Sequence, residues 1–335
     1  MDAYRMGNRA KARWLRLVVA ALCAAAAPAL SQQTWKPDGP VEISVPSGPG
    51  GGTDHTARVM QKILQERQFL NVPVSVVNKS GGGGLVALNY LKQYGGNAHF
   101  LQTASAVLLT SHIVGRSTVN YTDVTPVALL QSEYIVLAVK SDSPLKTASD
   151  LLARLKRDPA ALSFAVGTTL GGANHAAAAA LARAAGADPR KMRAVVFKSS
   201  SESAVAALGG HVDVMSASAS QVLPHVRSGA MRMLAVTAPK RLAGELGAVP
   251  TFRENGIDAE VNNFRFLIGP SGLNAAQIAY WDQVMAKLAQ TDEWKKDLEN
   301  TQAENTYMNS RDVRKYLDNE YAELKSLLTA MGMAK

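Results

Sequence analysis

Apolar runs alternate with glycine-rich loops and helical patterns in the first part of the chain. Residues 41–46 form a short apolar run, and residues 47–52 contribute four glycines and one proline. The residues that follow open a helical pattern with apolar positions at Ala57, Met60, Ile63 and Leu64. This order predicts a strand, a glycine loop and the N-terminus of a helix, which Thr53 or Asp54 would cap.

A loop of this kind can hold a ligand. Glycines let the backbone approach a ligand closely, and the free N–H groups of a first helical turn favour an anion. The alternative is a tight turn between strand and helix that binds nothing, because a glycine loop alone is a weak signal.

The same unit recurs further along the chain. We expect a strand at 72–77, a second glycine loop at 78–84, a helix at 85–94 and a third strand at 100–103. Strands that each feed a loop and a helix predict a mostly parallel α/β sheet. Ligands of such sheets lie beyond the carboxyl ends of the strands, so both glycine loops and residues 103–105 would lie at the binding edge.

The pattern restarts in the second part of the chain. A strong apolar strand at 135–139 ends at a break that contains Pro144. The further strands that we expect are 163–166, 193–197, 212–216, 233–237 and 264–268. The helices that we expect there are 148–156, 175–185, one that opens at 199–203, 275–290 and 311–331.

We interpret this repetition as two α/β lobes joined by two crossings. The first lobe would comprise residues 32–140 and 263–335, and the second lobe residues 141–262. Glycine and hydroxyl loops of the two lobes, including 167–174, would face each other across a cleft, which is a common place for a ligand. Closure about two crossing strands would be a hinge motion.

The first 31 residues have the order of a secretory signal peptide. Five basic residues precede an apolar, alanine-rich run, and small residues at 29–31 suit cleavage near Ser31. The alternative is an uncleaved membrane anchor. The single cysteine, Cys23, lies within this segment, so the mature chain would contain no disulfide. We therefore expect a periplasmic protein.

Charge and motif content argue against several classes of function. The formal net charge is +9, of which the five basic residues and Asp2 of the signal contribute +4, so +5 remains. No basic cluster with interleaved aromatic residues is present, so nucleic acid is not an expected partner. The six histidines lack metal-ligand spacing, and no phosphate-binding or dinucleotide motif is complete. We expect no metal, no cofactor and no enzymatic activity.

Several sequence blocks resemble those of one protein family, and they occur in the family's order over nearly the whole mature chain. The run 49–58, P-G-G-G-T-D-H-T-A-R, resembles the P-G-G-x-x-D-x-x-A-R signature of the tripartite tricarboxylate transporter receptors, the Bug-type solute-binding proteins. Asn78 with the glycines at 81–84 resembles their second loop. Residues 208–215, L-G-G-H-V-D-V-M, are similar to another block, as are 223–237, with Arg241 after them, and 249–256.

This resemblance implies a type II periplasmic binding protein-like fold, with a small carboxylate solute held in the cleft between the lobes. It also implies delivery of that solute to the membrane components of a tripartite tricarboxylate-type transporter, by a receptor that we expect to be a monomer. The alternative is a receptor that presents its closed form to a signalling partner. Departures from the family pattern at 97–100, 167–175 and 195–199 concern the identity of the solute more than its class.

In such receptors loop backbone groups, hydroxyls and ordered waters hold the carboxylate. We expect Asp54 to order its loop through an i,i+4 pair with Arg58, and His175 to make a structural hydrogen bond. Lys198 would complement a second ligand charge or remain solvated. The candidate ligand-binding residues are Ser47, Gly50, Gly51, Gly52, Asp54, Asn78, Gly82, Gly83, Thr103, Ser105, Thr168, Thr169, Gly171, His175, Lys198 and Ser218.

Overall fold

The computed structural model describes residues 35–167, 169–330 and 332–335. Within these ranges nine strands form one sheet in the order β2-β1-β3-β9-β4-β7-β5-β6, and β8 pairs with β4. Residues Lys36–Lys335 form one compact unit. The predicted signal peptide lies outside the described residues. No helix among the described residues is long and apolar enough to span a membrane.

The first strand–loop–helix units are confirmed. Strands β1, β2 and β3 are parallel, with Ile43 of β1 opposite Val76 of β2 and Leu101 of β3. The elements of this part of the chain are β1 (Val41–Val45), α2 (Gly52–Glu66), β2 (Val74–Asn78), the 3-10 turn η1 (Gly82–Gly84), α3 (Leu85–Lys92), β3 (Phe100–Ser105), α4 (Val107–Ile113) and η2 (Tyr121–Asp123). Helix α4 was not predicted.

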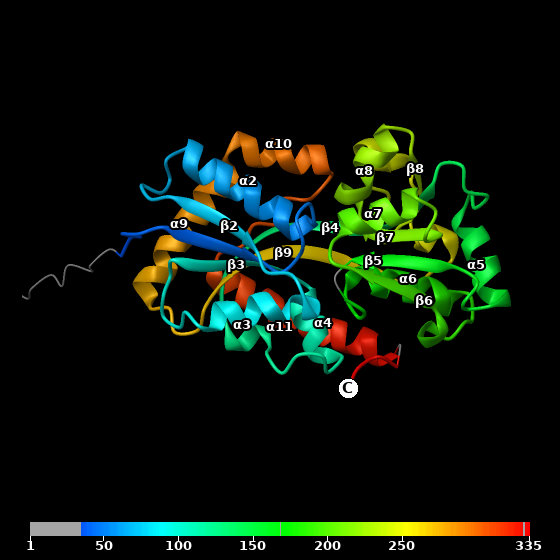
Figure 1. Cartoon of the computed structure of the whole chain (residues 1–335), viewed down its shortest axis with the longest axis horizontal. Coiled ribbons are helices and arrows are strands. Elements are labelled where there is room, and N and C mark those ends of the chain that lie inside the picture. The colour runs from blue at the N-terminus through cyan, green and yellow to red at the C-terminus, as the bar shows by residue number, and fades with distance from the viewer. Residues whose placement is uncertain (1–34, 168, 331) are drawn as a thin grey trace, which may run out of the picture. The chain divides into compact units, whose positions relative to one another are not determined.

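Two strands carry the chain between the halves of the sheet (Figure 1). Strand β4 (Thr125–Lys140) pairs with β9 (Asn262–Gly269) as far as Tyr134, and from Ile135 onward with β7 and β8. We call the β1–β3 and β9 side, with the first part of β4, the first lobe, and the remainder of the sheet the second lobe. The change of partners precedes residue 140, and the division at 140 and 263 remains a prediction.

The expectation of a mostly parallel sheet is wrong at the centre of the sheet. Strand β9 is antiparallel to both β3 and β4, and β4 is antiparallel to β7 and β8. The two crossing strands run in opposite directions because one leaves the first lobe and the other returns to it. Parallel pairing is confined to β1–β3 and to β5–β7.

The second lobe repeats the strand–loop–helix pattern. Its elements are α5 (Ala148–Arg157), β5 (Ser163–Gly167), α6 (Ala173–Ala184), η3 (Pro189–Lys191), β6 (Arg193–Phe197), α7 (Ser200–Leu208), β7 (Val214–Ser218), α8 (Ala219–Arg227), β8 (Met231–Val236), η4 (Gly244–Ala248) and η5 (Arg253–Asn255). The chain ends with α9 (Ala275–Gln290), α10 (Asp292–Thr301) and α11 (Ser310–Ala330). Helices α8 and α10 were not predicted.

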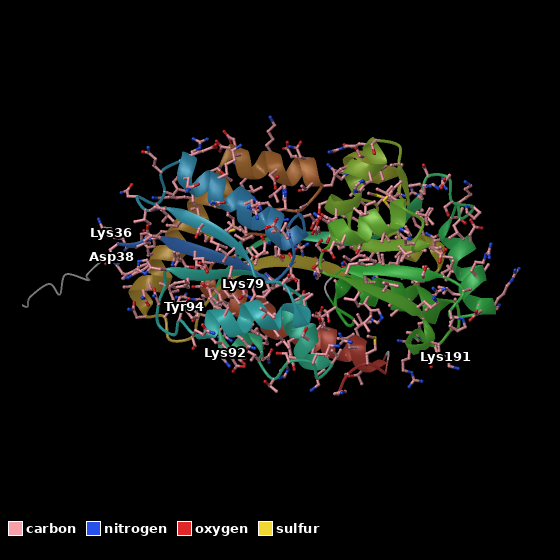
Figure 2. The ribbon with its side chains drawn as sticks, viewed as in Figure 1. Lys36, Asp38, Lys79, Lys92, Tyr94 and Lys191 are labelled. Carbon is pink, nitrogen blue, oxygen red and sulfur yellow. The ribbon has the colours of Figure 1, made fainter. Side chains whose placement is uncertain are left out.

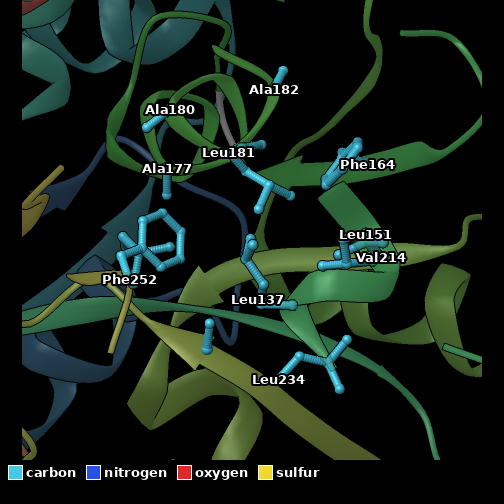
Figure 3. Packing of buried hydrophobic residues seen from close by; sticks show 14 of the residues in the cluster. Leu137, Leu151, Phe164, Ala177, Ala180, Leu181, Ala182, Val214, Leu234 and Phe252 are labelled. Carbon is cyan, nitrogen blue, oxygen red and sulfur yellow. The ribbon is translucent and has the colours of Figure 1, made fainter. Parts of the chain in front are cut away.

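The core of the second lobe forms beneath the alanine-rich helix α6. Ala177 and Leu181 of this helix pack with Leu137 of β4, Phe164 of β5 and Phe252 (Figure 3). Small side chains bring the helix backbone close to the sheet, and the large residues of the strands fill the space between them. This packing fixes the N-terminus of α6 at the carboxyl end of β5.

His175 holds the turn that precedes α6. Its Nδ1 accepts a hydrogen bond from the Gly171 N–H at 3.1 Å. Burial, with a smaller contribution from the Arg116 guanidinium, lowers the pKa of His175 from 6.5 to about 4. The ring is therefore neutral at pH 7, as its role as an acceptor requires.

We expect His175 to make the protein less stable in mild acid. The unfolded chain takes up a proton near pH 6.5 and the folded chain only near pH 4, so stability falls as the pH falls through this window. Urea unfolding near neutral pH and at about pH 4.5 should show a smaller loss for His175→Asn than for the parent. The exposed His211 provides a control, and His211→Asn should behave like the parent. Equal pH dependence in parent and His175→Asn would contradict this assignment.

Candidate functional site

A cavity of about 50 Å³ lies between the two lobes, at the carboxyl ends of the parallel strands. The first glycine loop and η1 line it from the first lobe, and the starts of α6 and α7 line it from the second lobe. A water molecule needs roughly 10–15 Å³ by the same measure, so the space suits a few waters or a small solute.

Helix N-termini converge on this cavity. Helices α2, α6 and α7 begin there, at Gly52, Ala173 and Ser200, and the cap residue of α8, Ser218, also lines it. Among the described residues, the first-turn N–H groups of Gly52 and Thr53 have no acceptor, and the intrahelical bonds of α2 begin with His55 N–H to Gly51 O. Such an arrangement favours an anion.

Hydroxyl and amide groups supply further polar contacts in the cavity. Ser47 Oγ lies 2.7 Å from Thr53 Oγ1, and Ser218 Oγ accepts from Asn263 Nδ2 at 2.8 Å. The buried Asn174 Oδ1 has no hydrogen-bond partner within the described part of the chain. An acceptor without a partner at a cavity wall is available to a ligand or to water.

One charged side chain lies among the described residues that line the cavity. Arg265 of β9 is 4% exposed, and its Nη2 donates to Glu133 Oε1 at 2.5 Å and to Ser218 Oγ at 3.3 Å. The labelled surface lysines Lys36, Lys92 and Lys191 lie at the periphery (Figure 2). No carboxylate is among the described residues that line the cavity, although Glu133, the partner of Arg265, lies buried behind it.

The expectation that Asp54 orders the first loop is confirmed. Its carboxylate accepts from Gly50 N at 2.8 Å, Arg58 Nε at 3.0 Å and Asn78 Nδ2 at 2.8 Å. Asn78 also donates to Ser47 O at 3.0 Å. Burial raises the pKa of Asp54, but these hydrogen bonds outweigh it and hold the pKa below 3.8.

The glycines of the first loop have different roles. Gly50 has a φ of +74°, which favours glycine, and its N–H is used by Asp54. Gly51 has a φ of −74° and donates to Gly48 O at 3.3 Å, so its N–H is already occupied within the loop. Gly52 allows a close approach, because a Cβ at this position would lie 2.3 Å from Arg265 Nη2.

Direct contacts join the lobes around the cavity. Gly48 N–H donates to Lys198 O at 3.1 Å, and Ser201 Oγ donates to Gly50 O at 2.6 Å. On a neighbouring stretch, Arg116 Nη1 donates to Thr169 Oγ1 at 3.0 Å. The structure therefore has its lobes in contact over the cleft.

The structure brings part of the predicted set together. The cavity is lined by Ser47, Gly51, Gly52, Gly83, Ser105 and Ser218. Gly50, Asp54 and Asn78 support the first loop from behind, and Gly82 stands next to Gly83 in η1. The functional role of these residues remains a prediction.

Other predicted residues lie away from the cavity lining. Thr103 is buried in β3, and the side chain of Lys198 is exposed while its carbonyl contacts the first loop. Gly171 and His175 line a separate cavity together with Arg116, on the side of the α6 N-terminus that is turned away from the cleft. Thr169 contacts Arg116, and Thr168 lies outside the described residues.

Sequence reasoning missed Arg265, Asn263 and Asn174. The available signal for Arg265 was a single charged residue between Phe264 and Phe266 in an apolar run that was expected to be a strand. Local sequence gave no indication of Glu133, its partner 132 residues earlier.

Comparisons with known proteins agree with this architecture. The chain is 28% identical to "UPF0065 protein in gbd 5'region" of Cupriavidus necator, over 94% of each chain. It is 30% identical to "Protein BugT" of Bordetella pertussis, over 66% of this chain and 67% of that protein. The solved structure "R. palustris Rpa4515 with adipate" superposes with a TM-score of 0.82 at 24% identity, covering 89% of this chain and 99% of the other.

A TM-score of 0.82 to the solved structure of the periplasmic binding protein BugD confirms the predicted two-lobe α/β fold of periplasmic binding proteins. The family model described as "Tripartite tricarboxylate transporter family receptor" matches residues 56–333, which is most of the chain. That model covers both lobes and most of the elements that line the cavity. The chain therefore belongs to the tripartite tricarboxylate transporter receptor family.

Proposed function

We propose that this protein is a periplasmic receptor that captures a small carboxylate-bearing solute in its cleft and delivers it to a tripartite tricarboxylate-type membrane transporter. The observation that carries the proposal is the convergence of helix N-termini and Arg265 on a cavity whose described lining residues include no carboxylate. Membership of the receptor family supports the transporter partner, and one structural neighbour, R. palustris Rpa4515, was solved with adipate.

Binding by backbone amides and hydroxyls suits a carboxylate physically. Hydrogen bonds to an ionised acceptor contribute roughly 1.5–3 kcal/mol each. The amides of a folded helix turn are already oriented, so the solute meets donors that need little further ordering. Charged side chains other than Arg265 are then unnecessary in the described part of the cavity.

Closure of the lobes would complete the site. The first loop contacts the second lobe through the backbone of Lys198 and the hydroxyl of Ser201. Among the described strands β4 alone pairs in both halves of the sheet, and the chain returns to the first lobe at the start of β9, which suits rotation about two crossings. A bound anion would lie between helix N-termini of both lobes and would favour the closed arrangement.

We expect carboxylates to stabilise the folded protein and their isosteric amides to have little effect. A thermal-shift screen of aliphatic and aromatic acids, each beside its amide, measures this. A ligand at one hundred times its Kd adds about 2.7 kcal/mol to the stability of the state that binds it. If no acid in the panel raises Tm above its amide, the anion-receptor proposal is wrong.

Gly52→Ala should weaken carboxylate binding about tenfold or more, because the new methyl group would meet the guanidinium of Arg265 at the first turn of α2. The matched control is Gly39→Ala, since a Cβ at Gly39 meets nothing within 4 Å. Calorimetry with the tightest acid of the screen compares both variants with the parent. Parent-like affinity in Gly52→Ala would show that this turn does not contact the solute.

Solution scattering should report closure. We expect the radius of gyration of the exported protein to fall when a saturating acid is added, because the lobes approach as the cleft closes. The corresponding amide serves as the control and should leave the radius unchanged. An acid that binds by calorimetry without any compaction would contradict hinge closure while leaving the binding proposal intact.

A further inference from the structure

Arg265 occupies a position that packing alone does not explain. Its neighbours in β9, Phe264 and Phe266, lie in the hydrophobic core, and the alternation of the strand turns Arg265 to the opposite face, at the cavity. The side chain is 4% exposed. Burying a guanidinium is costly even when it is paired, and replacement of such a pair by apolar residues is often neutral or stabilising.

The partners of Arg265 leave part of the guanidinium free. Nη2 makes both of the hydrogen bonds found among the described residues, to Glu133 and to Ser218. The buried Nε has no partner there. Glu133 is 1% exposed and also accepts from Ser220 Oγ, so each carboxylate oxygen has a donor while donors on the guanidinium remain.

The guanidinium also stands against the start of α2. A Cβ on Gly52 would meet Nη2 at 2.3 Å and Cζ at 3.1 Å. A helix N-terminus carries partial positive charge and disfavours a neighbouring cation. An anion held between the two would interact favourably with both, through the free first-turn N–H groups of Gly52 and Thr53 and through Arg265.

We propose that Arg265 contacts the solute and shares its carboxylate with the first turn of α2. On this basis Arg265 sets the preference of the cleft for an ionised group over a neutral isostere. Glu133 positions the guanidinium and offsets its charge whenever no solute is bound. This inference rests on the proposed function and assigns the residue responsible for charge recognition.

The test measures discrimination between acid and amide by calorimetry. The probes are propionate, succinate, adipate and benzoate, each beside the amide that replaces every carboxylate. The parent should bind at least one acid about tenfold or more tightly than its amide. Arg265→Met/Glu133→Leu removes both buried charges together, so no unpaired charge remains. This double variant should lose most of that discrimination while it retains the affinity of the parent for the amide.

Two further variants make the result specific. Arg265→Lys keeps a positive charge beside Glu133 but loses the planar guanidinium, so this variant should also discriminate less between acid and amide. It replaces the double variant in the test if the double variant does not fold. The exposed Lys92 of α3, which lines none of the described cavities, provides the control, and Lys92→Ala should discriminate like the parent. A merely structural role for Arg265 would lower the affinities for acid and amide equally.

The outcomes separate the two levels of the proposal. If the folded variants keep the acid preference of the parent, or lose affinity for acid and amide alike, the role of Arg265 is overturned and the receptor function stands. If the parent binds no acid of the panel more tightly than its amide, the proposed function is overturned and the role of Arg265 with it.

Discussion

The pairing of Arg265 with Glu133 joins the parts of the structure on which the cleft depends. It links β9 to β4, the two strands that cross between the lobes, and it reaches α8 through Ser218 and Ser220. Such a pair in a low-dielectric interior is sensitive to geometry, because either charge alone would be left uncompensated. The pairing of β4 with β9 and the start of α8 are thus tied to one guanidinium, and the start of α2 lies against it.

The free N–H groups at the cleft result from the way in which α/β units are built. A strand that ends at the sheet edge feeds a helix whose first N–H groups have no intrahelical acceptor. Two lobes made in this way present several such helix starts to each other, and the described cavity lining adds mainly glycine and hydroxyl residues. Backbone dipoles therefore contribute to the attraction for an anion at this place, beside the guanidinium of Arg265.

Local features could be predicted from the sequence, and pairings between distant segments could not. The loop 47–52, the position of α2 and the i,i+4 pair of Asp54 and Arg58 are set by residues a few positions apart, so patterning identified them. The expected cap by Thr53 or Asp54 is wrong, because Gly51 is the N-cap of α2 and no side chain caps this helix. The first part of β4 and the antiparallel insertion of β9 depend on partners more than 120 positions away. Arg265 and Asn174 became visible as site residues only when the fold placed them, because an isolated charge or amide carries no spacing signal.

The first loop also shows why capture and closure are linked in this fold. Its Gly48 N–H and Gly50 carbonyl are used for contacts with the second lobe, while Gly50 N–H and Gly51 N–H are used within the loop. The donors that remain are those of the first helical turn, whose residues Gly52 and Thr53 line the cavity together with Arg265. Opening the lobes would break the contacts of Gly48 and Gly50 and move α6 and α7 away from the same anion. A solute that binds the turn therefore gains its remaining donors only when the cleft closes, and its differential affinity for the closed form drives that closure.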